Sequence, residues 1–132
     1  MGKLENKELI RNMFVEMSKG NAEAFLGNLA DNVCFTVIGT TRFSGTFNGK
    51  QEFLNKALAP LSAQLDGGIS LTPDSFIADG DYVAMQARGK SDTKGGVTYN
   101  DTYCYIFRIA NGKVQEATEY LDTELVTKAF AW

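Results

Sequence analysis

The sequence predicts an α+β fold in which helices cover one face of a curved antiparallel sheet. Up to about residue 61 the apolar side chains recur at helical spacing, whereas from Gly67 onward the hydrophobic pattern has a period of two. Runs typical of strands then follow one another on short turns, which indicates an antiparallel meander. Helices that precede the strands favour this arrangement over a parallel sheet. At 132 residues, we expect a single domain over positions 1–132.

Three helices are expected in the first half of the chain. The first covers about residues 4–18 and ends before Gly20. Asn21 is a typical N-cap for a short second helix. Asn48, with Gln51 three residues later, fits a capping box at the start of a longer third helix. The apolar residues at helical spacing are Leu9, Ile10, Met13, Phe14 and Met17 in the first helix, Phe25, Leu26 and Leu29 in the second, and Phe53, Leu54, Ala57, Leu58 and Leu61 in the third.

Five strands and a closing helix complete the expected elements. One short strand covers residues 33–38, and a loop over 39–45 follows it. Asp122 or Thr123 begins a final helix that runs through about Phe130, and for Asp122 an N-cap is favoured over a catalytic role. The later strands are expected near residues 69–78, 81–92, 97–109 and 113–121, with turn signals at Asp79-Gly80-Asp81, Lys94-Gly95-Gly96 and Asn111-Gly112.

The turn at Asn111-Gly112 decides which side chains of the last two strands face each other. In a three-residue loop with Gly112 as a G1 bulge, Glu119 faces Tyr103. In a two-residue loop, Glu119 lies opposite Cys104 and therefore on the other face of the sheet. The dipeptide Asn-Gly suits both loops, and we favour the bulge.

The bulge register places an acid/base pair among aromatic rings. Asp101, Tyr103, Tyr105, Ala117 and Glu119 then share one face, and the two acids are diagonal neighbours within about 7–8 Å. Partial burial of two carboxylates raises the pKa of one of them. A carboxyl group with a raised pKa can act as an acid or base near neutral pH without histidine.

A purely structural interpretation of the same residues stays open. Tyr99, Tyr103 and Tyr105 can be core aromatics, and Glu119 can be a solvated charge on the outer face. Gln86, Arg88 and Lys90 share a parity that is typical of a solvated strand face.

Composition excludes several classes of function. The net charge of −3 without a cluster of Lys or Arg argues against a nucleic-acid partner. The absence of histidine excludes Ser-His, Cys-His and His-metal sites, so no metal site is expected and any chemistry must use other side chains. No apolar run approaches about 18 residues and no signal-peptide pattern is present, so a cytoplasmic protein without a membrane partner is expected. Cys34 and Cys104 are expected to be buried small hydrophobes without a disulfide.

Five short motifs follow one another along the chain: Gly20-Asn21, Leu29-Ala30-Asp31-Asn32-Val33, Ser44-Gly45-Thr46-Phe47-Asn48-Gly49-Lys50, Asn111-Gly112-Lys113-Val114 and Glu119-Tyr120-Leu121-Asp122-Thr123. In their order and spacing they resemble the SnoaL-like, ketosteroid isomerase-related branch of the NTF2-like superfamily. The resemblance implies an NTF2-like (cystatin-like) cone: a strongly curved antiparallel sheet wrapped around a long helix, with N-terminal helices on the concave face and a pocket at the open end. Relatives are commonly dimers packed through the outer face of the sheet, which implies a homodimer here.

The family contains ketosteroid isomerases, polyketide cyclases, limonene-type epoxide hydrolases and non-catalytic binders. The ketosteroid isomerase residues are not retained: the general-base Asp falls near Val37, the first-helix Tyr on Met13 or Phe14, and the oxyanion-hole Asp on Tyr105. Only Tyr105 keeps a proton donor at its position, so the standard ketosteroid isomerase reaction is not expected.

The other two enzyme classes of the family match in part. The Arg of the epoxide hydrolases falls on Arg88 and their second Asp on Glu119, but their first Asp falls on Lys90, which removes half of the carboxylate pair. The single acid of the polyketide cyclases falls on Glu119 or Asp101, and their histidine has no counterpart. The resemblance further implies that Arg88 points inward.

These observations predict a pocket for a small hydrophobic molecule, with cofactor-free isomerase-like or cyclase-like chemistry on a carbonyl compound. A non-catalytic binder of the same fold is the alternative. Trp132 could close the pocket mouth or pack on a dimer partner. The expected catalytic residues are Glu119, Asp101, Tyr105 and Arg88, and the expected ligand-binding residues are Met13, Phe14, Met17, Phe35, Val37, Phe53, Leu54, Ala57, Tyr99, Tyr103 and Ala117.

Overall fold

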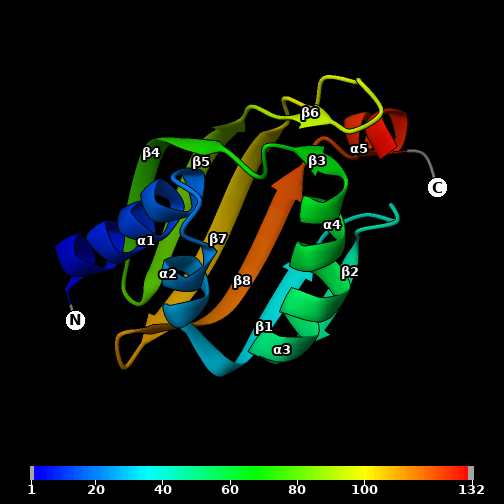
Figure 1. Cartoon of the computed structure of the whole chain (residues 1–132). Coiled ribbons are helices and arrows are strands. Elements are labelled where there is room, and N and C mark those ends of the chain that lie inside the picture. The colour runs from blue at the N-terminus through cyan, green and yellow to red at the C-terminus, as the bar shows by residue number, and fades with distance from the viewer. Residues whose placement is uncertain (1, 131–132) are drawn as a thin grey trace.

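A computed structural model describes residues 2–130 and shows a curved, open sheet with helices on one face (Figure 1). The main sheet has six strands in the order β2-β1-β8-β7-β5-β4, and β3 and β6 form a small second sheet. The helices are α1 (Lys3–Ser18), α2 (Ala22–Gly27), α3 (Lys50–Phe53), η1 (Leu54–Leu58), α4 (Ala59–Ala63) and α5 (Thr123–Phe130). The strands are β1 (Leu29–Val37), β2 (Gly45–Asn48), β3 (Leu65–Asp66), β4 (Leu71–Asp79), β5 (Tyr82–Gly89), β6 (Asp92–Thr93), β7 (Thr102–Ala110) and β8 (Lys113–Leu121).

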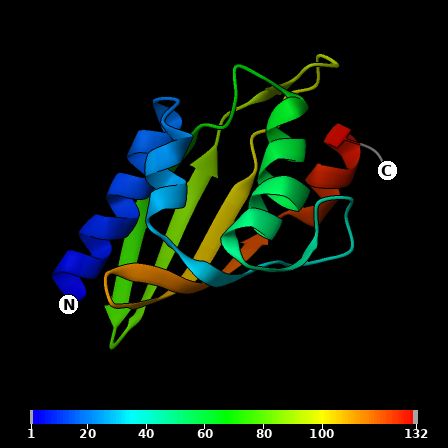
Figure 2. The same cartoon turned by 60° about the horizontal axis from the view of Figure 1, so that its bottom comes forward.

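The antiparallel meander is confirmed, and one parallel pairing is added to it. Strands β4, β5, β7 and β8 pair antiparallel in that spatial order, as the period-two pattern predicts. β1 then pairs parallel with β8, so the sheet is mixed. Helices α1 and α2 and the segment α3–η1–α4 lie side by side over the concave face, and α5 closes one end (Figure 2).

The helices form largely where the spacing predicts them. The Asn21 side chain accepts a hydrogen bond from the backbone N–H of Ala24, which confirms the N-cap of α2. The capping box at Asn48 and Gln51 is wrong, because the N-cap is Gly49 and the Glu52 carboxylate accepts from the Asn48 backbone N–H. The helix continues through Pro60, which lies in the first turn of α4, and the wider π turn η1 directly precedes α4.

Several strand boundaries differ from the sequence prediction. β1 begins at Leu29, which was expected in the second helix, and β5 ends at Gly89 instead of residue 92. The segment that enters the long helix forms β2, which pairs antiparallel with β1. The expected strand over 97–109 begins only at Thr102, because its partner β5 ends at Gly89 and the last residue pair is Arg88 with Thr102. The residues before it form a loop that brings Tyr99 into the interior.

The predicted bulge at Gly112 is wrong, yet the predicted face of Glu119 is correct. Asn111 and Gly112 both have positive φ angles, of 55° and 70°, as in a two-residue type I′ turn. An extra residue, Gln115, then shifts the register between β7 and β8. Compared with a regular hairpin, the side chains of β8 from Glu116 onward therefore lie on the opposite face of the sheet. Glu119 therefore pairs with Tyr105 instead of Tyr103, but on the concave face.

Two apolar clusters fill the space between the sheet and the helices. The larger one lies under α1, α2 and the long helix, and includes the stacked rings of Tyr103, Tyr105 and Phe107, whose centroids are 5.6 Å and 5.5 Å apart. The smaller one lies under α5 and contains Phe43, Leu65, Tyr99, Val126 and Phe130.

Both cysteines are free, as predicted, but neither is fully buried. Cys34 alternates with the buried Val33 and Phe35, and Cys104 alternates with the buried Tyr103 and Tyr105. Their side chains therefore belong to the outer face of the sheet.

Candidate functional site

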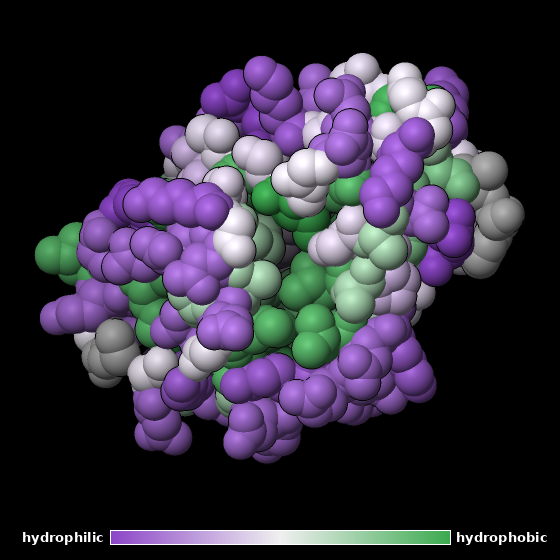
Figure 3. All heavy atoms as spheres, viewed as in Figure 1, coloured by the Kyte–Doolittle hydropathy of each residue, from purple (hydrophilic) through white to green (hydrophobic). Residues whose placement is uncertain are grey.

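A cavity lies between the concave face of the sheet and the helices. Its volume is about 60 Å³, which is room for a few water molecules or a small ligand group. In Figure 3 its apolar mouth is the hollow between α1 and α2 on one side and α4 on the other. The lining residues are Phe14, Met17, Phe25, Phe35, Val37, Thr41, Phe43, Phe53, Ala57, Leu58, Leu61, Ile69, Leu71, Tyr99, Tyr103, Tyr105, Glu119, Leu121 and Val126.

Glu119 is the one ionisable carboxylate among the lining residues. It sits on the central strand β8, where Val37 of β1 is its neighbour on one side and Tyr105 of β7 on the other. Burial among apolar groups raises its pKa to about 7; the Tyr105 hydroxyl opposes this shift and the charge of Asp101 adds to it. Near neutral pH, Glu119 is therefore poised to give or take a proton.

Three tyrosine hydroxyls accompany Glu119 along the cavity wall. The Tyr103 hydroxyl donates a hydrogen bond to the Tyr99 hydroxyl over 3.2 Å. Burial is the main cause that raises the pKa of Tyr99, Tyr103 and Tyr105, and the charge of Glu119 adds to it. All three therefore stay neutral and keep a proton to donate.

Asp101 is buried but does not line the cavity. Its Oδ1 accepts hydrogen bonds from the backbone N–H groups of Thr102, at 2.7 Å, and Asp122, at 3.0 Å. Because Glu119 pairs with Tyr105, Asp101 lies four residues along β7 from that pair, and the expected diagonal contact between the two acids is wrong. Burial raises the pKa of Asp101, and the two backbone N–H groups partly offset that shift.

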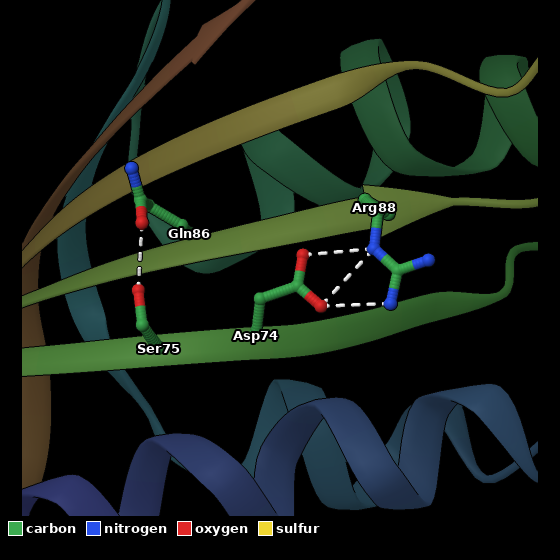
Figure 4. A network of polar contacts seen from close by, with 4 residues as sticks. All are labelled: Asp74, Ser75, Gln86 and Arg88. Atoms are coloured by element: carbon green, nitrogen blue, oxygen red, sulfur yellow. Dashed lines mark hydrogen bonds and ion pairs between the residues drawn. The ribbon is translucent and has the colours of Figure 1, made fainter.

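Arg88 lies outside the cavity. Its side chain points to the outer face of β5, where Nε and Nη2 donate to the Asp74 carboxylate at 2.8–3.1 Å (Figure 4). Ser75 and Gln86 form a second polar contact beside it. The inward orientation implied by the family resemblance is therefore wrong. The shared parity of the polar residues Gln86, Arg88 and Lys90, which alternate with apolar residues, is the sequence signal that predicts the observed face.

Most of the expected wall residues line the cavity, and three do not. The Met13 and Ala117 side chains are buried in the core beside it, and Leu54 is partly buried on the long helix. The expected wall residues that do line it are Phe14, Met17, Phe35, Val37, Phe53, Ala57, Tyr99 and Tyr103.

Nine further residues line the cavity that were not expected there. Thr41 and Phe43 come from the loop after β1, and Leu121 and Val126 come from the end of β8 and from α5. Apart from Thr41, their apolar character was the only available signal. Phe25, Leu58, Leu61, Ile69 and Leu71 complete the missed set.

Within residues 2–130 no cluster of three or more Cys, Asp or Glu side chains has the geometry of a metal site. The helices in this part of the chain are all too short or too polar to cross a membrane. Trp132 lies outside the described residues.

The comparison with known families matches residues 10–117 to the SnoaL-like domain. The chain belongs to the SnoaL-like domain family. No curated protein sequence matches it.

Solved structures, among them two that are described as NTF2-like proteins, align over nearly the whole chain of this SnoaL-like protein. An NTF2-like protein of unknown function from Burkholderia pseudomallei K96243 has a TM-score of 0.85 at 18% identity and covers 100% of both chains. An NTF2-like protein from Burkholderia xenovorans LB400 has a TM-score of 0.80 at 24% identity and covers 98% of each chain. TerC, co-crystallized with polyporic acid, has a TM-score of 0.81 at 23% identity and covers 94% of this chain and 96% of its own. These similarities confirm the NTF2-like fold.

Proposed function

We propose that this protein binds a small hydrophobic carbonyl compound in the aromatic cavity and moves a proton at the carbon next to the carbonyl. The observation that carries the proposal is Glu119, a carboxyl group in an apolar cavity with a pKa of about 7. A general acid or base works best when its pKa lies near the working pH. The cavity is otherwise lined by aromatic and aliphatic side chains, which suits an apolar ligand.

The proposed reaction uses two neighbouring groups on the central strands. The Glu119 carboxylate removes a proton from the carbon next to the carbonyl, and the electron pair of the broken C–H bond moves to the carbonyl oxygen. The neutral Tyr105 hydroxyl, which contacts Glu119 across the strand pair, donates a hydrogen bond to the developing oxyanion. Protonated Glu119 then returns the proton to the same or another carbon, which gives exchange or isomerisation without a cofactor.

The assay is exchange of the proton next to the carbonyl for deuterium in D₂O, followed by NMR on a panel of aryl ketones and cyclic enones. We expect exchange above the buffer rate with the wild-type protein and a loss of about 10²–10⁴-fold with Glu119→Gln. Glu116→Gln, on the outer face of the same strand, is the matched control and should retain the wild-type rate. Equal rates for wild type and Glu119→Gln across the panel would remove the proton-transfer proposal.

A non-catalytic binder is the second candidate, and one observation favours it. The Tyr103 hydroxyl is engaged with Tyr99, and Asp101 lies behind the wall, so Glu119 has no second carboxylate partner in the cavity. Calorimetric binding of an aryl ketone without any exchange above buffer would favour the binder.

The homodimer and the cytoplasmic location both stay proposals. On the outer face, Ile77 is 72% exposed and Tyr120 is 45% exposed, and Ile77 pairs across the strands with Ala84, next to Ile106. Apolar groups on a solvated sheet face support association of two copies there. Light scattering should give twice the chain mass, and Tyr120→Glu should shift it toward the monomer; a monomer at all concentrations would contradict the proposal.

A further inference from the structure

Asp101 is a buried acid that the proposed reaction does not use. Its side chain is 1% exposed, and only one of its two oxygens has a clear role. Oδ1 accepts the backbone N–H groups of Thr102 and Asp122, whereas Oδ2 has no hydrogen bond to any group in residues 2–130. A buried carboxylate oxygen without a partner is unfavourable, so a nearby hydrogen-bond donor would stabilise Asp101.

One side of Asp101 holds the start of the closing helix. Asp122, whose backbone N–H is bound by Oδ1, caps α5 by accepting from the N–H groups of Glu124 and Leu125 with its own side chain. Val126 of this helix lines the cavity. Asp101 therefore fixes the end of β7 to the helix that closes one end of the site.

The other side of Asp101 faces the tyrosine row. Tyr99 stands two residues before Asp101, and its hydroxyl lowers the pKa of the Asp101 carboxyl group against the effect of burial. The oxygen of the Tyr99 hydroxyl accepts from Tyr103, so the Tyr99 proton is not used in that bond. A carboxylate can only accept, so any hydroxyl that partners the free Oδ2 must donate to it.

We propose that Asp101 is a positioning residue of this site, which anchors α5 through Oδ1 and orients the Tyr99 and Tyr103 hydroxyls through Oδ2. In this arrangement the proton of Tyr103 points away from the ligand, and its oxygen presents lone pairs to the cavity. Tyr105 is then the tyrosine whose proton serves Glu119 and the ligand. The inference rests on the proposed site at Glu119, but its test needs neither a ligand nor turnover.

The test uses tyrosine labelled with ¹³C at Cζ, a carbon whose chemical shift reports the hydrogen bonding of its hydroxyl. The chain has five tyrosines, and Tyr82 and Tyr120 are exposed on the outer face as internal controls. Asp101→Asn keeps an oxygen for the two backbone N–H groups but places a donor where Oδ2 was. We expect the Tyr99 and Tyr103 signals to move while the signals of Tyr82 and Tyr120 stay.

Two further variants separate the two parts of the proposal. On a Tyr99→Phe background, Asp101→Asn should no longer move the Tyr103 signal, because the link between them is gone. Amide hydrogen exchange at Asp122 should stay near the wild-type rate in Asp101→Asn and rise by about tenfold in Asp101→Ala, which has no acceptor. If Asp101→Ala does not fold, the Asp101→Asn spectra alone decide.

Unmoved Tyr99 and Tyr103 signals in Asp101→Asn would overturn the orienting role. A Tyr103 signal that moves equally in the presence and absence of the Tyr99 hydroxyl would overturn the relay through Tyr99. Either result leaves the exchange assay for Glu119 unaffected, so failure of the inference is distinguishable from failure of the proposed function.

Discussion

The two faces of one sheet hold carboxylates that behave in opposite ways. On the concave face, burial raises the pKa of Glu119 to about 7. On the convex face, the hydrogen bonds from Arg88 lower the pKa of the exposed Asp74. Alternation along the strands separates aromatic rings from solvated ion pairs by a single residue. The chemistry of an acid in this fold therefore depends on the face of the sheet to which the strand register assigns it.

The largest difference between the faces should appear in packing. Phe107→Ala removes a fully buried ring from the stacked row, which should lower the free energy of unfolding by about 3–5 kcal/mol. Ile106→Ala, its neighbour on the outer face, is the matched control and should lower it far less because Ile106 is only partly buried. Urea denaturation of both variants measures the difference. Equal losses would mean that the faces do not differ in packing.

The opposite pKa shifts should give opposite dependences of stability on pH. The pKa of Glu119 is higher in the folded protein, about 7, than its ordinary value of 4.5, so the folded state binds the proton more tightly. Its stabilising contribution is complete below about pH 4.5 and is lost as the pH rises through 7, a total of about 3 kcal/mol. Glu119→Gln should remove this decline, as urea denaturation at pH 5 and pH 8 would measure.

Asp74→Asn should change the dependence of the unfolding free energy on pH in the opposite direction, in the same experiment. The lowered pKa of Asp74 gives stability that is present above its ordinary value of 3.8 and is lost as the pH falls below it. The variant should therefore differ from the wild type at pH 8 and not at the acidic limit. For Glu119, an unfolding free energy of Glu119→Gln that varies with pH in parallel with the wild type would show that Glu119 is solvated.

A smaller effect is expected at Gly89, the last residue of β5. A Cβ atom there would lie 3.1 Å from Cε2 of Tyr103, so in Gly89→Ala the tyrosine ring must move by a few tenths of an ångström. We expect a loss of about 1 kcal/mol in unfolding free energy, together with weaker binding of an aryl ketone. Gly27→Ala, with no heavy atom within 4 Å of the new carbon, is the matched control. Unchanged ligand affinity in Gly89→Ala would place the Tyr103 ring away from the bound molecule.

The smallest effect is expected on the outer face. Arg88→Ala removes a solvated ion pair and should leave the free energy of unfolding close to the wild-type value, because water screens exposed charges. Because Arg88 lies outside the cavity, the exchange rate of an aryl ketone should match that of the wild type. A large loss of exchange would restore the inward orientation that the family resemblance implies.

Sequence patterns predicted the elements better than their boundaries and contacts. Helical spacing located α1 and α2, and alternation located the meander, because each pattern reflects a local period. The start of β7 depends on where β5 ends. Whether Phe43 and Val126 line the cavity depends on how segments far apart in the sequence pack together. Neither feature produces a local repeat of apolar residues, so neither can be predicted from the hydrophobic pattern of the sequence.

The site itself was predicted in part. The face of Glu119 is correct, although the reason given for it is not, since the extra residue is Gln115 and not Gly112. Bulges of this kind have no distinctive sequence signal, because the residue that performs the shift need not be glycine. For Arg88, the strand parity was a better guide than the family resemblance.

The bulge at Gln115 decides on which face of the sheet the Glu119 side chain lies. The Gln115 side chain donates to the Ala110 carbonyl and closes over the hairpin, but any residue could fill the place in the backbone. Substitutions there should be tolerated, and deletion of Gln115 would leave a regular ladder in which Glu116 still pairs with Arg108 and Glu119 with Tyr105. With Gln115 present but paired in a regular ladder, Glu119 would instead lie opposite Cys104 and therefore on the outer face of the sheet. The bulge thus absorbs a residue that would otherwise move the acid out of the cavity.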